Sequence, residues 1–372
     1  MANSTPQSRR SPWYFTPGVT FVITVVIAFA FTTLILLLAG APPVATYYQL
    51  FKGSLGGFNK LTNVIRAWIP LTLCACGLLY TFRINLWNIG IEGQMMMGAV
   101  FATAFLRIET AVNQPGLCLA GAFLAGILGG ATWAFLAGVL KTRGRVHEIF
   151  AGLGLNFVAQ GVILWLIFGP WRRPGVASMS GTELFERVLW LPVVNRLSPA
   201  GLVLLAAAIL ITAAMIRYTR IGLNLKAIGQ NPTASYRFGI RPDRYMLIAI
   251  VFVGGFAGLA GTFQVTGVYH RLIPAISSNY GYLALLVVML ANYNVWTASA
   301  VAFFFACLNV GSIQLPMVLQ LDSSLSGVIQ GALVLSALAV GGWRLILIKR
   351  RAAAAVEGEA RLAGRQQQAG AA

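Results

Sequence analysis

A short polar stretch, residues 83–94 (RINLWNIGIEGQ), holds a dense group of side chains that could do chemistry. Asn88, Glu92 and Gln94 place two carboxamides and a carboxylate between two apolar segments, and Asn88 and Glu92 share a face if the stretch is helical. The two glycines of the stretch permit a sharp break or a close helix approach. Two interpretations follow: a polar lining or hinge of a path through a membrane, or a buried network that fixes a helix break.

Three further carboxamides lie in later apolar segments. Asn156 and Gln160 are four residues apart, so they share a helix face, and Gln264 lies near the end of another apolar run. A carboxamide offers donors and acceptors that suit sugar hydroxyls or the edges of a base. The alternative is a hydrogen bond between helices, which contributes about 0.6 kcal/mol on average in a membrane protein.

Recognisable catalytic constellations are missing from the sequence. It contains no G-x-x-x-x-G-K-[ST] phosphate loop, no H-E-x-x-H and no G-x-S-x-G, and it has only nine acidic residues. The four cysteines lie in apolar segments, and Cys74-x-Cys76 lacks metal-ligand spacing, so we expect no metal site and no cofactor in this chain. If the chain moves a solute across a membrane, the energy must come from a partner or from an ion gradient.

The composition identifies a polytopic, all-α membrane protein. Hydrophobic residues make up 58% of the chain, charged residues 10%, and the mean hydropathy is +0.77. A membrane-spanning helix needs about 20 apolar residues. Ten segments fit: 19–40, 62–82, 91–106, 117–140, 149–169, 200–216, 246–266, 281–292, 297–313 and 325–342. The first is long enough to be an uncleaved span rather than a signal peptide. The segments at 91–106 and 281–292 are short enough to be broken or re-entrant.

Glycines spaced for close helix packing occur in two of these segments. Gly126 and Gly130 form a G-x-x-x-G pair, and Gly254, Gly258 and Gly261 lie along a later helix. We expect them to be structural.

The distribution of Lys and Arg predicts the orientation. With residues 1–18 in the cytoplasm and ten alternating spans, roughly two thirds of the basic residues face inward, as the positive-inside rule requires. The net charge of +18 is therefore a topology signal, and we expect no nucleic-acid partner, because the charge is spread over short loops. Residues 19–345 form the membrane domain, and the Ala-, Gln- and Gly-rich residues 346–372 form a cytoplasmic tail that we expect to be disordered.

A basic segment at 217–245 separates two apolar spans and carries six Lys or Arg residues. Its centre predicts a short helix that begins near Asn231-Pro232 and ends near Gly239, because Pro suits the first helical turn and Gly the position just past the last. An isolated cytoplasmic helix in a multispan protein suggests a docking site for a partner.

Several of these stretches resemble those of a known family. Asn88-Ile-Gly-Ile-Glu-Gly-Gln94 resembles the NIG-x-EGQ signature of nucleoside and simple-sugar permeases, and Val146-His-Glu-Ile149 with Leu155-Asn156 resembles a second segment of that group. The cytoplasmic coupling loop of the family is matched at Ala227, Gly229, Asn231, Ala234, Gly239 and Ile240. The chain thus resembles the membrane permease subunit of an ABC importer, in the group of ribose, nucleoside and branched-chain amino-acid permeases. His147 and Ser235 stand where the family usually has Asn and Ala.

The resemblance implies a fold with two pseudo-repeated helix bundles and a set of partners. These are a cytoplasmic ABC ATPase that binds ATP, a second permease subunit (a paralogue or an identical copy), an extracytoplasmic substrate-binding protein, and the lipid of a bacterial-type inner membrane. It implies a non-catalytic subunit, with nucleosides or related purines as the expected substrates and a simple sugar as the alternative. An ion-coupled secondary transporter is the rival from another class; Glu92 is the one ionisable residue expected deep in the membrane to support it.

Overall fold

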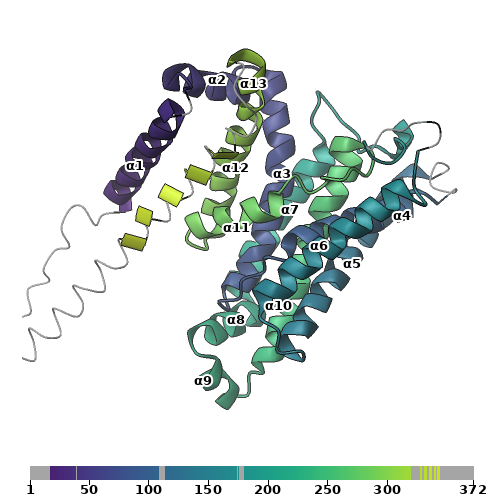
Figure 1. The fold of residues 1–372 in the computed structure, drawn as a ribbon. Coiled ribbons are helices and arrows are strands. Elements are labelled where there is room, and N and C mark those ends of the chain that lie inside the picture. The colour runs from purple at the N-terminus through teal and green to yellow at the C-terminus, as the bar shows by residue number, and fades with distance from the viewer. Residues whose placement is uncertain are drawn as a thin grey trace, which may run out of the picture. The chain divides into compact units, whose positions relative to one another are not determined.

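The computed structural model describes residues 17–38, 40–108, 114–173, 175, 180–319 and scattered positions between 327 and 343. Within these residues the chain is helical, and its one β-type contact is an isolated bridge between Val194 and Leu197. The helices, shown in Figure 1, are α1 Pro17–Leu38, α2 Pro43–Leu55, α3 Phe58–Phe82, α4 Ile91–Leu106, α5 Pro115–Thr142, α6 Glu148–Phe168, η3 Arg187–Leu189, α7 Pro199–Tyr218, α8 Arg220–Gln230, α9 Pro232–Arg237, α10 Pro242–Phe263, η4 Gln264–Tyr269, α11 Tyr280–Leu290, α12 Val295–Ser312 and α13 Gln314–Leu319. The expected all-α class is confirmed for this part of the chain.

Among the described helices, six are long and apolar enough to cross a membrane: α3, α5, α6, α7, α10 with η4, and α12 with α13. The number rises to seven if the bent pair of α1 and α2 counts as one span. Helices α4 and α11 have 16 and 11 residues, shorter than the ~20 that a full crossing needs. Only scattered positions of the expected span at 325–342 are described, and the predicted number of ten spans is not confirmed within the part of the chain that the structure describes.

The chain divides into two compact units. The larger unit runs from Gln49 to Gln314, and the smaller comprises Met1–Tyr48 and Leu315–Ala372. Within the smaller unit, the Tyr47 hydroxyl donates to the Phe29 carbonyl at 3.2 Å, which ties the start of α2 to α1. Every candidate site residue lies in the larger unit.

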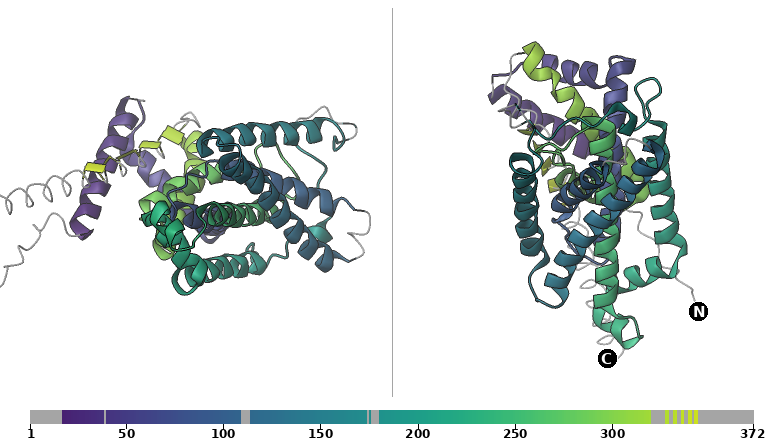
Figure 2. Two further views of the ribbon diagram at one scale, coloured as in Figure 1. Left: turned by 90° about the horizontal axis from the view of Figure 1, so that it is seen from below. Right: turned by 90° about the vertical axis from the view of Figure 1, so that its right-hand side faces the viewer.

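Helix α10 is central to the larger unit, where it packs against α3, α4 and α5 (Figure 2). The helices differ in burial, which distinguishes inner helices from outer ones. In α3, 83% of the most apolar 18-residue stretch is buried, against 33% in α5, α6 and α7. An apolar helix with an exposed face is stable in lipid, because its backbone hydrogen bonds are satisfied within the helix. The short α4 packs between α5, α6, α10 and α11, so it is a buried element.

Glycines bring α4, α5 and α10 into backbone contact. A methyl group on Gly258 of α10 would collide with the Gly126 carbonyl of α5, and one on Gly98 of α4 would collide with Gly258. Gly130 makes the same kind of approach to Gly254. Close approach of backbones is how small residues stabilise helix pairs in membranes. The predicted structural role of these glycines is confirmed.

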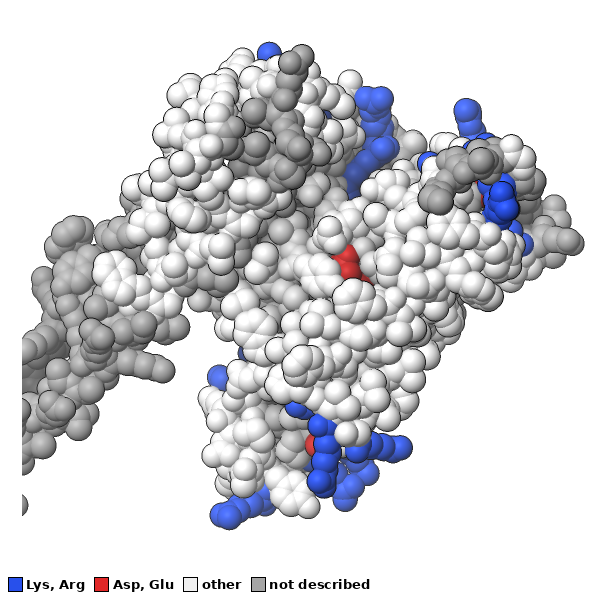
Figure 3. All heavy atoms as spheres, viewed as in Figure 1, with Lys and Arg blue, Asp and Glu red and all other residues white. Residues whose placement is uncertain are grey.

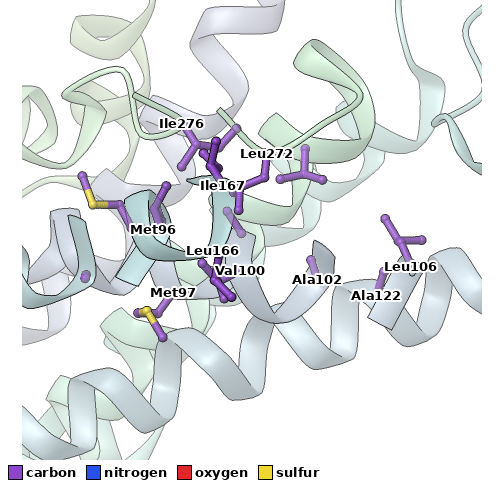
Figure 4. Packing of buried hydrophobic residues seen from close by; sticks show 14 of the residues in the cluster. Met96, Met97, Val100, Ala102, Leu106, Ala122, Leu166, Ile167, Leu272 and Ile276 are labelled. Carbon is purple, nitrogen blue, oxygen red and sulfur yellow. The ribbon is translucent and has the colours of Figure 1, made fainter. Parts of the chain in front are cut away.

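A hydrophobic cluster fixes the other side of α4. Met96, Met97 and Val100 of α4 pack with Leu166 and Ile167 of α6 (Figure 4). The segment after η4 closes this cluster with Leu272 and Ile276. The cluster holds α4 and α6 in register, which decides how the polar residues at the start of α4 meet α6.

Candidate functional site

The polar stretch 83–94 forms a tight turn between α3 and α4 and then the first turn of α4. Asn88 and Gln94 pair across this turn: Asn88 Nδ2 donates to Gln94 Oε1, and Gln94 Nε2 donates to Asn88 Oδ1, both at 3.1 Å. Both side chains are buried, with 5% and 0% of their surface exposed. A buried amide without partners is costly, so the reciprocal pairing stabilises the turn.

Asn156 of α6 joins three elements. Its Oδ1 accepts from the Gly93 amide at 2.8 Å, and its Nδ2 donates to the Ile89 carbonyl and to the Tyr282 hydroxyl, each at 3.0 Å. One carboxamide thus holds the turn before α4, the first turn of α4 and the first turn of α11. Both of its amide hydrogens and its oxygen are used inside the protein.

Glu92 caps the start of α11. Its Oε2 accepts from the Gly281 amide at 2.8 Å, and the Ser277 hydroxyl and the Asn279 and Tyr282 amides also face the carboxylate. The N-terminus of a helix favours a negative group, so the position suits a carboxylate. A methyl group on Gly281 would collide with Glu92 Oε2. Among the residues that the structure describes, Glu92 Oε1 has no hydrogen-bond partner.

Glycines allow α6 to come this close to the turn. A Cβ on Gly152 of α6 would lie 2.6 Å from the Gly90 amide nitrogen. One on Gly93 would lie 2.8 Å from Asn156 Oδ1, where it would displace the hydrogen bond to that oxygen. Gly90 and Gly93 therefore serve close approach, one of the two uses expected of them.

The remaining two carboxamides lie apart from this network. Gln160, one turn further along α6, donates from Nε2 to the Pro274 carbonyl at 3.1 Å. Gln264 begins η4, a π-helical turn that follows α10, and is buried with 1% of its surface exposed. In the described part of the chain, no hydrogen bond joins either residue to Asn88, Glu92 or Asn156.

The structure therefore gathers four of the six predicted path residues into one buried network. The groups of Asn88, Gln94 and Asn156 that could bind a substrate are engaged with one another or with the backbone. This geometry favours the interpretation that the network fixes the break between α3 and α4. A contact between any of these residues and a substrate stays a prediction.

The basic segment contains two short helices, α8 and α9. Asn231 separates them and caps α9, because its Oδ1 accepts from the Ala234 amide at 3.0 Å. Pro232 is the first residue of α9, and Gly239 follows its end with a φ of 82°. The Gly239 amide donates to the Tyr236 carbonyl at 3.0 Å and the Ile240 amide to the Ser235 carbonyl at 3.1 Å, which is a Schellman motif. The predicted helix and both of its ends are confirmed.

Gly229 of α8 contacts the turn that precedes the polar network. A methyl group on it would collide with the Arg83 carbonyl, and the Gly229 carbonyl accepts from Asn85 Nδ2 at 2.8 Å. Ala227 and Ala234 are half-buried, as are Gly229 and Ile240. These four residues therefore shape the segment from within and present little of their own surface to a partner.

Two exposed aromatic residues, which the sequence interpretation did not single out, lie at α9 and its end. Tyr236 has 67% and Phe238 has 85% of its surface accessible, next to the basic Arg237. Figure 3 shows Lys and Arg gathered at the end of the molecule that carries α8 and α9, with a nearly uncharged surface beside them. The periodicity of a helix could have predicted this exposure. Because Ser235 is buried, its neighbours on α9 point outward.

Comparisons with known proteins place these features in a family. The glucose ABC transporter permease protein TsgB13 of Haloferax volcanii is 28% identical over 84% of this chain and 85% of its own length. The guanosine permease NupP of Bacillus subtilis is 25% identical over 80% and 86%, and the nucleoside permease NupB of Lactococcus lactis subsp. cremoris 24% over 78% and 82%.

The family model for the permease component of branched-chain amino acid transport systems matches residues 60–338. That match takes in the polar network, the basic segment and the membrane-spanning helices. With the apolar helices described above, it identifies a multi-pass plasma-membrane protein. The chain belongs to this family of ABC transporter permeases.

Proposed function

We propose that the chain is the permease subunit of an ATP-driven importer for nucleosides or related purines. The guanosine and nucleoside permeases among its relatives support the substrate class, and so does the NIGIEGQ stretch at residues 88–94. A glucose permease is also among them, so a simple sugar is the second candidate substrate.

The observation that carries this proposal is the rigid, exposed α9. Its N-cap at Asn231 and its Schellman ending at Gly239 hold the helix in place, and Tyr236 and Phe238 project from it. Exposed aromatic side chains on a charged surface are typical of the central contacts of protein interfaces. A cytoplasmic ATPase that binds ATP would pack against these two rings, with the basic residues of the segment at the rim.

The transport path would form between this chain and a second permease subunit, either a paralogue or an identical copy. An extracytoplasmic binding protein would deliver the substrate to the side opposite α9. The energy would come from the ATPase, because the sequence has no phosphate-binding loop of its own. On this proposal the N-terminus and the basic segment 217–245 face the cytoplasm.

The test is uptake of labelled guanosine, other nucleosides, ribose and glucose by cells with and without the gene. We expect loss of nucleoside uptake in the deletion strain, restored by the wild-type chain. If only sugar uptake is lost, the assignment as an importer stands and the substrate is a sugar. Loss of uptake when the ion gradient collapses while ATP is held constant would overturn the ATP-driven mechanism.

Two variants test the proposed contact between α9 and the ATPase. Phe238→Ala and Tyr236→Ala remove exposed rings, so the permease should reach the membrane in normal amounts while uptake and ATPase co-purification fall at least tenfold, the effect of losing an interface hot spot. Tyr218→Ala is the matched control, because Tyr218 is also exposed (77%) but precedes α8. Equal retention of the ATPase by all three variants would rule out α9 as its docking site.

A further inference from the structure

A basic pocket lies at the other end of the larger unit from α9. Its volume is about 460 Å³, and it is lined by residues from α3, from the segment around η3 and from the end of η4. Its charged and aromatic lining residues are Arg66, Arg187, Trp190, Arg196 and His270, and the rest of the lining is the apolar stretch 191–193. A cavity of this size lies within the ~300–1,000 Å³ range of small-molecule sites.

The positive charge of this pocket is not neutralised within the described residues. Neither Arg66, Arg187 nor Arg196 forms an ion pair with an acidic side chain there. Arg66 and Arg196 repel each other. Burial lowers the pKa of His270, and the charge of Arg66 lowers it further. Three Arg residues thus line one pocket without a carboxylate, and Arg187 and Arg196 are exposed to an anion that arrives from outside.

The pocket is also built before any ligand arrives. Asn195 and Arg196 have φ values of 49° and 67°, in a tight turn closed by the bridge between Val194 and Leu197. Asn adopts this conformation readily, whereas Arg is strained in it, and strain of this kind is retained where the surrounding structure fixes it. Arg66 Nε donates to the Arg196 carbonyl at 3.1 Å, which holds the two residues together.

The aromatic wall of the pocket is equally well fixed. The Trp190 ring stacks on His270, with centroids 3.9 Å apart and planes 7° from parallel. Trp190 Nε1 donates to the Phe185 carbonyl at 2.9 Å. The Thr266 carbonyl lies 2.9 Å from His270 Nδ1 and accepts from the amide of the residue after Trp190 at 3.0 Å.

The pocket lies at the ends of the spans. Helix α7 begins at Pro199, just after the turn that carries Arg196, and ends at Tyr218 beside α8. Its 20 residues span about 30 Å, the thickness of the hydrocarbon core, so the pocket and α8 face opposite sides of the membrane. Val188, Val193 and Val194 are about half exposed or more next to the basic groups. A basic pocket with an apolar rim at this depth fits a phosphate group at the membrane surface.

We propose that this pocket is a phosphate-binding site, which takes the phosphate of a lipid headgroup or of a free phosphorylated solute. The planar fork of Arg matches the oxygens of a phosphate in pairs, and three such groups suit an anion of more than one charge better than a single carboxylate. The volume leaves room for the group that the phosphate carries. This proposal does not depend on which substrate the transporter moves.

The first experiment titrates the purified transporter, assembled from the full chain and its partner subunits in detergent, with inorganic phosphate at constant ionic strength. Arg196→Gln removes the charge. Arg196→Gly removes it and also relieves the left-handed backbone, so that variant remains folded. Both should weaken phosphate binding by about tenfold or more, the loss expected for a hydrogen bond to a charged group. Arg172→Gln, an exposed Arg before the same loop but outside the pocket, is the control and should bind as the wild type does.

The second experiment identifies the source of the phosphate. Vesicles of phosphatidylglycerol that compete with inorganic phosphate in the wild type, but not in Arg196→Gly, would assign the pocket to a lipid headgroup. Binding of inorganic phosphate without such competition would assign it to a free solute. The proposal is overturned if the wild type binds no phosphate or if all four chains bind it equally. Loss of uptake in Arg196→Gln without phosphate binding by the wild type would assign the pocket to protein docking instead.

Discussion

Single carboxamides of α6, one inside the polar network and one outside it, differ in how many hydrogen-bond partners they have. Asn156 makes three hydrogen bonds that link α6 to Gly93, Ile89 and Tyr282, whereas Gln160 makes one, to the Pro274 carbonyl. Both are carboxamides on the same helix, one turn apart. The sequence shows them as equivalent, and the contacts make them different.

Asn156→Ala should therefore destabilise the protein more than Gln160→Ala does. It leaves a buried amide hydrogen and a buried carbonyl without partners, at about 1–3 kcal/mol for each unsatisfied group. The apparent melting temperature of the solubilised permease measures the difference. If Asn156→Ala instead keeps its melting temperature and loses uptake, the residue lines the substrate path.

Glu92 offers a second contrast at this scale. Gly281→Ala should destabilise the protein by about 1–3 kcal/mol, because the added methyl collides with the Glu92 carboxylate. Glu92→Gln keeps an oxygen that can accept from the Gly281 amide, so it should be stable and transport normally. A stable Glu92→Gln protein without uptake would show that transport needs the charge of the carboxylate, as a substrate contact or an ion-coupled mechanism requires.

Among the elements, hydropathy predicted the long helices and also the short α4 and α11, at 91–106 and 281–292, whereas the residues at its ends predicted α9. Apolar runs reveal α3, α5, α6, α7, α10 and α12, and the Pro and Gly residues around α9 reveal its bounds. Helix α2 was not predicted because its sequence mixes tyrosines, Lys and Gln with apolar residues. The turn η4 was not predicted because a π-turn has no sequence pattern of its own. The pairing of Glu92 with Gly281 joins residues far apart in the sequence, which no local pattern encodes.

Helix α8 should tolerate no side chain at Gly229. Gly229→Ala drives a methyl into the Arg83 carbonyl, so α8 must separate from the turn that leads into the polar network. We expect less folded protein in the membrane, measured by fluorescence-detected size-exclusion chromatography. Gly154→Ala is the control, because a Cβ on that helical glycine meets no atom within 4 Å. Normal assembly of Gly229→Ala without transport would place the effect at the ATPase contact.

At the scale of the whole molecule, the charged ends of the helices predict the topology. The basic pocket and the α8–α9 segment lie at opposite ends of α7, so we expect them to face different compartments. The prediction of ten spans is not confirmed, because α4 and α11, at the predicted segments 91–106 and 281–292, have only 16 and 11 residues. Helices α4 and α11 are apolar because they are buried among other helices.

Labelling single cysteines tests this topology. In a parent whose partly exposed Cys118 and Cys307 are replaced by Ser, a membrane-impermeant maleimide should modify Val194→Cys in intact cells. It should modify Phe238→Cys only after the cells are permeabilised, because Val194 and Phe238 are exposed at opposite ends of the spans. Modification of both in intact cells would contradict the assigned topology.

The shared contact at Gly258 limits how this protein can be recombined with its relatives. One residue of α10 meets the backbone of α5 through Gly126 and that of α4 through Gly98. A chimaera that takes only α10 from a relative would have to fit the backbones of both α5 and α4 of this chain at the same residue. The smallest exchangeable module therefore contains α4, α5 and α10 together.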